Sequence, residues 1–211
     1  MDLTMENKIE KLGRYEKKEI LELLKRALKN VSADYVLLGH PSELDIFVER
    51  VFAYELYHQM RLLFRDKHGV VNGEYRKYLK LIPDIDNNKT YIPDLVVHQP
   101  STLDRNFLAI EIKTSPSLNR NDLKRDLGKL EFYTRPPKLE GLGFQLGVML
   151  IVNYDIEKEI TCDKSLKDEL RSFLEKYPRN SIWTLSFEKE KDGIFVPIVK
   201  TFMSDSPILC N

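Results

Sequence analysis

The sequence predicts an α/β fold in which a central mixed β-sheet is flanked by α-helices. Charged segments with apolar residues at helical spacing alternate with short β-branched, apolar segments of strand length. The expected order is two helices, a meander of strands, and then helix, strand, helix and final strands, which is typical of a mixed sheet between helices. The 211 residues suffice for one domain with a buried core, and 42% apolar with 31% charged residues is an ordinary globular balance.

Two helices are expected at the amino-terminal end. Residues 5–30 form a charged segment whose apolar positions mostly fall at helical spacing. These positions are Ile9, Leu12, Ile20, Leu23, Leu24, Ala27 and Leu28. A second helix is expected from Ser42, a candidate N-cap, to about Phe64, with one strongly apolar side.

The rest of the chain alternates strands, turns and helices. In the middle of the chain, the sequence predicts a turn flanked by Gly69 and Gly73, a strand at 74–79 and a turn at Asn87-Asn88. A strand at 91–98, a loop at 99–106 and a strand at 107–113 are expected to follow. The last part predicts a helix at 119–133 ended by Pro136-Pro137, a strand at 144–153, a helix at 163–177 stopped by Pro178, and strands at 181–187 and 194–202.

Composition restricts the classes of function. Lys plus Arg and Asp plus Glu both number 33, so the net charge is zero. A small protein that coats DNA non-specifically is usually basic, so any nucleic-acid contact must come from a local patch or from partner subunits. Cys162 and Cys210 lack metal-ligand spacing, so neither a disulfide framework nor a zinc site is expected. The charged amino terminus has no apolar signal region and the longest apolar run, 148–152, is far too short for a membrane span, so we expect a cytoplasmic protein.

The most informative residues lie in the two strands at 91–98 and 107–113. Residues two apart in a strand point to the same face, so Glu111 and Lys113 project together while Ile110 and Ile112 face a core. If Asp94 lies on the neighbouring strand of a hairpin, its carboxylate comes beside that of Glu111. Two adjacent carboxylates repel each other unless a cation lies between them.

A hard divalent ion, Mg²⁺ or Mn²⁺, would relieve that repulsion, and the Ile112 carbonyl could add a third oxygen ligand. Such an ion activates water and neutralises a phosphate. Lys113 would then orient or deprotonate the attacking water, or stabilise charge on the phosphate oxygens. The alternative is that Asp94 is a turn residue and that Glu111 and Lys113 form a solvated strand face.

Residues 92–98, IPDLVVH, and residues 106–114, NFLAIEIKT, closely resemble the motif pair of the PD-(D/E)xK nuclease superfamily. Asp94, Glu111 and Lys113 fall on its three signature positions. The resemblance covers roughly 43–153 and is to a small uncharacterised member. It implies a restriction-endonuclease-like fold over a single domain, 1–211, in which residues 1–40 are an amino-terminal helical extension.

The resemblance also implies a helical glutamate ahead of the strands, for which Glu49 and Glu55 are the candidates. Six helical residues rotate about 240° beyond a full turn, so both side chains cannot point into one site. Glu55 lies near the middle of the apolar face and Glu49 at its edge. A metal-site carboxylate belongs at the rim of the core, so we expect Glu49 in the site and Glu55 elsewhere, with a solvated helix charge as the alternative for Glu49.

The helix at 119–133 carries a row of basic residues beside Tyr133. Contacts to nucleic-acid phosphates are expected from Arg120, Lys124, Arg125 and Lys129. The alternative is an ordinary solvated helix face. The four histidines have no metal spacing, and there is no glycine-rich phosphate loop, so no nucleotide cofactor is expected.

Taken with the resemblance, these residues predict a Mg²⁺-dependent nuclease that hydrolyses DNA phosphodiester bonds in restriction, repair or mobile-element processing. An endonuclease is the first expectation, and symmetric double-strand cutting would favour a homodimer. The second hypothesis is a non-catalytic nucleic-acid-binding or assembly subunit that keeps the nuclease fold.

Overall fold

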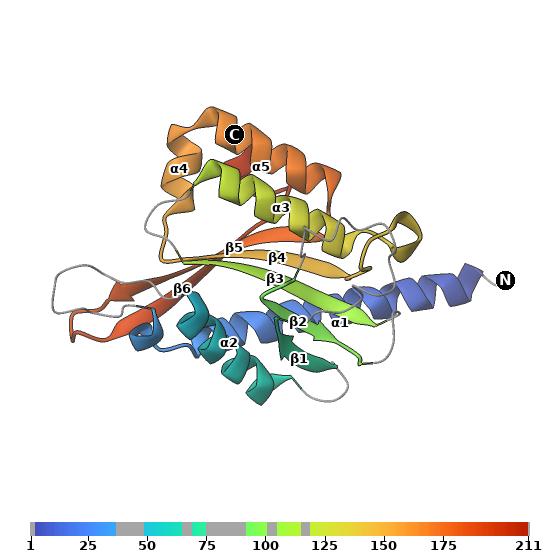
Figure 1. The fold of residues 1–211 in the computed structure, drawn as a ribbon, viewed down its shortest axis with the longest axis horizontal. Coiled ribbons are helices and arrows are strands. Elements are labelled where there is room, and N and C mark those ends of the chain that lie inside the picture. Colours follow the sequence, from blue (N-terminus) through green and yellow to red (C-terminus); the bar gives the residue numbers. More distant parts are fainter. Residues whose placement is uncertain are drawn as a thin grey trace.

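The computed structural model describes residues 3–36, 49–64, 69–74, 92–100, 105–114 and 119–210, and it is built around a six-stranded mixed sheet. The strands follow the chain order across the sheet (Figure 1). They are β1 (Val70–Gly73), β2 (Leu95–His98), β3 (Asn106–Thr114), β4 (Leu146–Val152), β5 (Asn180–Lys189) and β6 (Phe195–Phe202). The middle strands β3, β4 and β5 are parallel, and all other neighbours are antiparallel.

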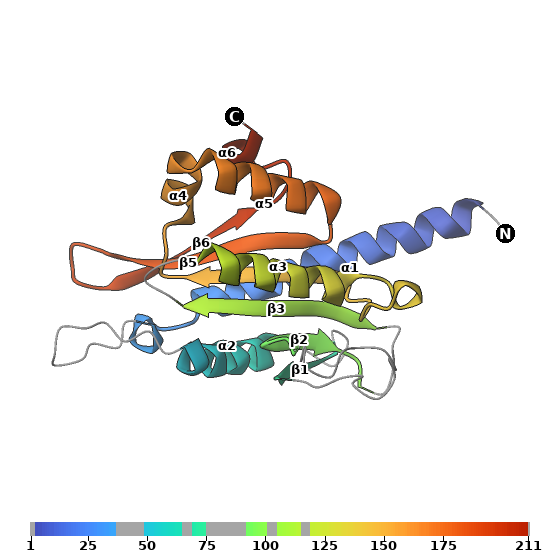
Figure 2. The ribbon, with the colours of Figure 1, turned by 45° about the horizontal axis from the view of Figure 1, so that its top comes forward.

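Helices cover both faces of this sheet, as Figures 1 and 2 show. One face carries α1 (Leu3–Lys29) and α2 (Glu49–Leu63), and the other carries α3 (Arg120–Thr134), α4 (Ile156–Cys162) and α5 (Lys164–Lys176). The short helix α6 (Pro207–Cys210) lies against α4 and α5. Short 3-10 helices occur at Ala33–Tyr35 and Pro137–Leu139.

Strand alternation divides the interior into two cores. On β3, Ile110 and Ile112 pack against α1 and α2, whereas Ala109 belongs to the core beneath α3 and α5. Because both faces of the central strands are covered, β4 is a nearly continuous apolar run rather than an alternating one. The predicted α/β fold, a mixed sheet flanked by helices, is confirmed.

The second half of α1 is part of the core. Ile20, Leu24 and Leu28 are almost fully buried and pack in the same cluster as the α2 and β3 side chains. The amino-terminal helix, expected as an extension, therefore supplies one wall of the domain.

Several described elements differ from the expectations, among them the two 3-10 helices, which were not expected. The segment after Gly69 was expected to be a turn but forms strand β1, paired with β2. Gly69 has a φ of +88°, and a Cβ there would come 2.6 Å from the His98 carbonyl oxygen, so glycine marks a close backbone approach at the strand start. The short helices α4 and α6 were not expected; Asp155 caps α4 by accepting a hydrogen bond from the Lys158 N–H.

Several expected features lie outside the described residues. These are the Ser42 cap, most of the strand at 74–79 and the turn at Asn87-Asn88. Among the helices that the structure describes, none has the length and apolar character needed to span a lipid bilayer.

Candidate active site

The antiparallel pairing of β2 with β3 brings Asp94 beside Glu111. Leu95, the first residue of β2, pairs with Ile110, and Asp94 directly precedes Leu95, so Asp94 lies next to the β3 residues that follow Ile110. The Asp94 Oδ2 atom accepts a 2.7 Å hydrogen bond from the Ile112 N–H. Asp94 thus lies immediately before β2, and its carboxylate accepts the Ile112 N–H in place of a backbone carbonyl of a neighbouring strand.

Glu111 is held from the opposite side by α3. Its side chain is nearly inaccessible, because the residue is only 2% exposed. The Tyr133 hydroxyl donates to Oε1 and the Lys129 ammonium donates to Oε2, each at 2.8 Å. These two bonds fix the orientation of the carboxylate between the sheet and the helix.

Asp126 on α3 joins Lys113 to the same cluster. Its side chain is fully buried and forms ion pairs with Lys113 at 3.0 Å and with Lys129 at 2.7 Å. Glu111 and Lys113 therefore share one face of β3, as alternation predicts. Arg125 also approaches Asp126, with 3.8 Å between its Nε atom and Oδ1, so three cations surround this buried carboxylate.

The electrostatic surroundings raise the pKa of both strand carboxyls. Burial raises the pKa of Asp94 to about 6, with a further contribution from Glu49 and opposition from the Ile112 N–H, Lys129 and Lys113. Burial and the charge of Asp94 raise the pKa of Glu111 to about 7, against the opposing effects of Lys129 and Tyr133. The pair is thus strained by desolvation and mutual repulsion, which an added cation would relieve.

The two lysines are cations in this arrangement. Burial lowers the pKa of Lys113, but the hydrogen bond and charge of Asp126 outweigh burial and leave it above the ordinary value. Burial also lowers the pKa of Lys129. The charges and hydrogen bonds of Glu111 and Asp126 outweigh burial and raise this pKa to about 12. Of the roles expected for Lys113, charge stabilisation suits a protonated side chain, whereas deprotonating water does not.

Of the two helical glutamates, Glu49 lies on the side of Asp94. It is the first residue of α2, and its charge acts on both Asp94 and Lys113. Glu55 instead accepts a 2.6 Å hydrogen bond from Gln59 one turn along the helix. The structure therefore brings Glu49, and not Glu55, toward the β2–β3 carboxylates.

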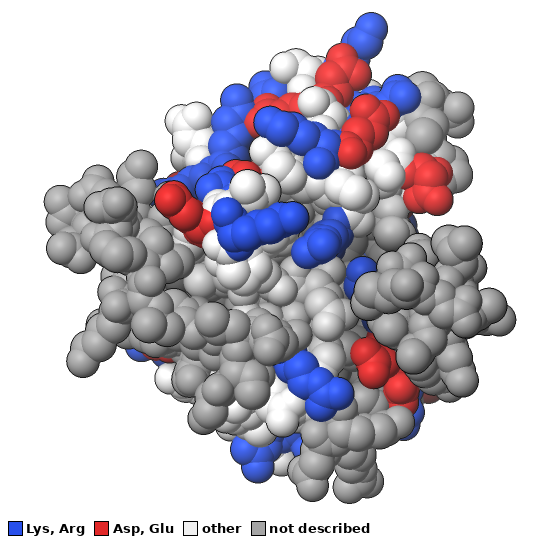
Figure 3. Space-filling view, turned by 90° about the vertical axis from the view of Figure 1, so that its right-hand side faces the viewer, with Lys and Arg blue, Asp and Glu red and all other residues white. Residues whose placement is uncertain are grey.

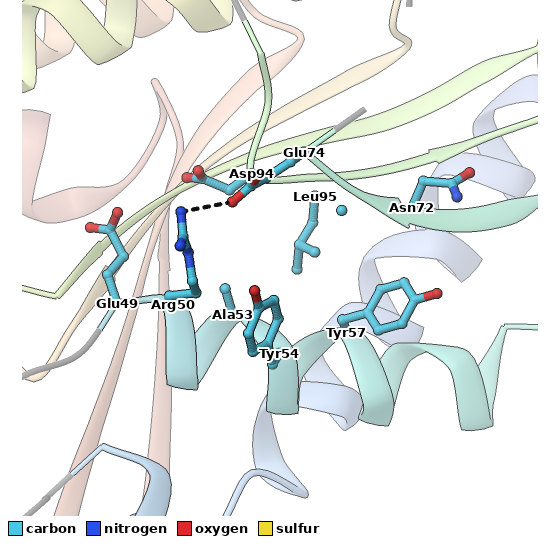
Figure 4. Close-up of a pocket in the computed structure, with 10 residues that line it drawn as sticks. Glu49, Arg50, Ala53, Tyr54, Tyr57, Asn72, Glu74, Asp94 and Leu95 are labelled. Atoms are coloured by element: carbon cyan, nitrogen blue, oxygen red, sulfur yellow. Dashed lines mark ion pairs between the residues drawn. The ribbon is translucent and has the colours of Figure 1, made fainter. Parts of the chain in front are cut away.

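Asp94 also borders a cavity of about 500 Å³ between α2 and the strands β1 and β2 (Figure 4). Its walls combine charged, aromatic and apolar side chains. They are Glu49, Arg50, Ala53, Tyr54, Tyr57, Asn72, Gly73, Glu74, Asp94 and Leu95. The cavity and the carboxylate pair thus share Asp94 as a common wall.

The donor set around Asp94 and Glu111 fits a hard divalent cation. Each carboxylate oxygen has two lone pairs, so the bonds to Tyr133, Lys129 and Ile112 leave acceptor capacity on both groups. The N–H and C=O of one strand residue point to the same side, so the Ile112 carbonyl faces the Asp94 edge of β3. No three His, Cys, Asp or Glu side chains gather as a ligand set among the residues the structure describes, so an ion here would need this backbone oxygen.

The basic row expected to contact nucleic acid is engaged with acidic groups of the protein. Arg120 pairs with Asp163 and Glu169, Lys124 with Glu169, and Arg125 with Asp122. Lys129, the fourth predicted contact, belongs to the Glu111 cluster.

The face where the parallel strands begin carries charges of both signs. Figure 3 shows lysine and arginine side chains interspersed with aspartate and glutamate side chains over this face, which lies at the right of Figure 1. Glu111 and Lys113 lie toward the other end of β3.

Sequence reasoning missed Asp126 and Tyr133 as members of the site and misplaced Lys129. A signal was present, because Asp126 and Tyr133 are seven residues apart and share the helix face of the buried Leu130. An acidic residue on the apolar face of a helix needs a buried partner. His98, in contrast, is a satisfied buried histidine, with Nε2 2.8 Å from the Asn72 Oδ1 atom.

No protein-family model matches the chain, and a comparison with curated proteins finds no match. The function must therefore be argued from the geometry of the site.

Proposed function

We propose that this protein is a Mg²⁺-dependent nuclease of the PD-(D/E)xK type that hydrolyses phosphodiester bonds of DNA. The observation that carries the proposal is the meeting of Asp94 and Glu111 across β2 and β3, with Lys113 on the Glu111 face of β3. The raised pKa of both carboxyls supports it, because strongly perturbed groups in a cleft are typical of functional sites.

Each residue of the cluster has a distinct part in this reaction. Mg²⁺ held by Asp94, Glu111 and the Ile112 carbonyl would activate water and neutralise the scissile phosphate. Lys113, kept protonated by Asp126, stabilises the negative charge that develops on the phosphate oxygens.

The α3 side chains act on the carboxylate itself. Tyr133 and Lys129 hold Glu111 in one orientation, so that its free lone pairs face a fixed point. Such preorganisation avoids reorientation during the reaction.

A cleavage panel tests the proposal. Supercoiled plasmid, linear duplex, single-stranded DNA and RNA are incubated with the protein in Mg²⁺, in Mn²⁺ and in EDTA. We expect wild type to cut in Mg²⁺ and in Mn²⁺ but not in EDTA, and Glu111→Gln to cut under none of these conditions. Glu55→Gln is the matched control, since Glu55 is engaged with Gln59 and should leave cutting unchanged.

Absence of cutting on every substrate with every divalent ion would reject catalysis. DNA binding without cutting would then favour a non-catalytic nucleic-acid-binding subunit. A homodimer and a cytoplasmic location belong to the same proposal and are tested by the mass of the protein in solution and by fractionation of cells.

A further inference from the structure

The cavity beside Asp94 has the size of a small-molecule site. Ligand cavities in proteins are commonly about 300–1,000 Å³, and this one is about 500 Å³. Asp94 is part of one wall, so an occupant would lie against one of the two carboxylates proposed to hold the metal ion.

Two tyrosines from α2 give the cavity an aromatic wall. Tyr54 is 64% exposed, so its ring is accessible to an occupant of the cavity. Figure 4 shows Arg50 and Tyr54 directed from α2 toward the strand edge that carries Asp94, with Tyr57 lying toward Asn72. Arg61 contacts Tyr57 in two ways. Its guanidinium lies 5.9 Å from the centre of the tyrosine ring and donates a 3.4 Å hydrogen bond to the tyrosine hydroxyl.

The remaining walls supply apolar contacts and an arginine whose ion-pair partner can be replaced by a ligand. Ala53 and Leu95 contribute apolar surface. Arg50 and Glu74 form a 3.4 Å ion pair at the mouth, but their side chains are 68% and 65% exposed. Exposed ion pairs contribute little to stability, so Arg50 can leave Glu74 for a phosphate at small cost.

We infer that this cavity binds an unpaired nucleobase of the substrate, stacked on Tyr54, with Arg50 on an adjacent phosphate. The inference rests on the proposed nuclease function and names its substrate class as nucleic acid that is single-stranded next to the cut. The aromatic ring of Tyr54 offers a stacking surface for a base, Ala53 and Leu95 offer apolar contact, and the exposed guanidinium of Arg50 offers a partner for the adjacent phosphate. A base within an intact duplex would first have to leave its stack, whereas an unpaired base enters without that cost.

The binding of single strands that carry the fluorescent base 2-aminopurine tests this. A set of strands of about eight nucleotides, each with the probe at a different position, is titrated without divalent ions, so that cutting cannot interfere. Wild type should quench the emission at one position, since stacking on an aromatic ring quenches this base. Tyr54→Ala should abolish that quenching and raise the Kd roughly 5- to 150-fold, the range that base–aromatic stacking accounts for.

Two further variants sharpen the test. Ala53→Leu narrows the cavity without adding charge and should also weaken binding. Tyr35→Ala is the matched control, because Tyr35 is also an exposed tyrosine, 42% exposed, but lies on the 3-10 helix and not in the cavity wall. Tyr54 is largely exposed, so its removal should leave the melting temperature close to that of wild type.

Equal Kd values for wild type and Tyr54→Ala, or quenching that survives Tyr54→Ala, would overturn the inference. The cleavage panel run beside it separates the two ideas. Tyr54-dependent binding without any cutting would support the base site and reject the nuclease. Cutting with binding indifferent to Tyr54 would support the nuclease and reject the base site.

Discussion

Replacing Glu111 by glutamine should stabilise the protein at pH 8 in the absence of divalent ions. Glutamine is close in shape to glutamate and keeps an acceptor oxygen for the Tyr133 hydroxyl, but it carries no charge. The substitution removes the repulsion with Asp94 and the cost of burying an anion. We therefore expect stability and function to oppose each other at this position.

The size of the effect follows from the pKa of Glu111. Its rise from 4.5 to about 7 corresponds to about 3 kcal/mol of destabilisation at a pH above both values. This figure is already net of the ion pair between Glu111 and Lys129, and Lys129 keeps its ion pair with Asp126 in the variant. The glutamine amide N–H₂ would take the place of Oε2 opposite the Lys129 ammonium, and this donor–donor contact offsets part of the gain. A net gain of ~1–3 kcal/mol should raise the melting temperature by roughly 2–10 °C for a chain of this length.

The pH dependence gives the sign of the prediction. Between the unfolded pKa of 4.5 and the folded pKa of about 7, the folded state binds more protons, so wild-type stability falls as pH rises. Below pH 4.5 Glu111 is protonated in both states and its penalty is absent. The advantage of Glu111→Gln should therefore be larger at pH 8 than at pH 5.

Thermal unfolding in EDTA at both pH values measures this, with Glu55→Gln as a control expected to change little. Mg²⁺ should raise the melting temperature of wild type more than that of Glu111→Gln, because a ligand stabilises the state that binds it. A variant less stable than wild type at pH 8, or a difference that does not change with pH, would refute the reasoning.

Two further substitutions separate metal binding from positioning. Asp94→Asn should stop cutting by weakening the metal site, and high Mn²⁺ should restore part of the rate in a metal titration. The variant should also bind DNA more tightly, because a negative charge is removed, and binding isotherms measure this. A loss of cutting that no Mn²⁺ concentration restores would contradict the metal-binding role of Asp94. Asp126→Asn removes the buried partner of Lys113 and Lys129 and should cost about 3 kcal/mol, seen as a fall of several degrees in melting temperature. Unchanged melting would mean that Asp126 does not hold the lysines.

The strand pair that carries Asp94 and Glu111 could be predicted because its signals are local. Alternation within residues 107–113 fixes which side chains share a face, and a hairpin is the shortest way to pair two adjacent strands. Register then follows from the residues themselves, since a slip by one would turn Ile110 and Ile112 out of their core.

The rest of the site depends on contacts between distant segments. Asp126 reaches Lys113 only because α3 crosses back over β3, and the cavity needs α2, β1 and β2 together. Strand β1 is four residues long, follows Gly69 and ends at Gly73, so its local pattern is that of a turn until β2 pairs with it. Tertiary pairing overrides local preference in such short strands.

The most direct test of the proposed function is the Mg²⁺-dependent cleavage rate of Lys113→Ala under single-turnover conditions. Truncating Lys113 leaves no apolar cavity, and Asp126 keeps its ion pair with Lys129, so the variant should be less stable than wild type but still folded, while losing about 10²–10³-fold in rate. Lys200→Ala is the matched control, because Lys200 also forms an ion pair, with Glu157, but lies on β6 away from the site. A wild type that cuts in Mg²⁺ and not in EDTA, with Lys113→Ala inactive and Lys200→Ala fully active, is the predicted result; a Lys113→Ala protein that cuts as fast as wild type would contradict the account.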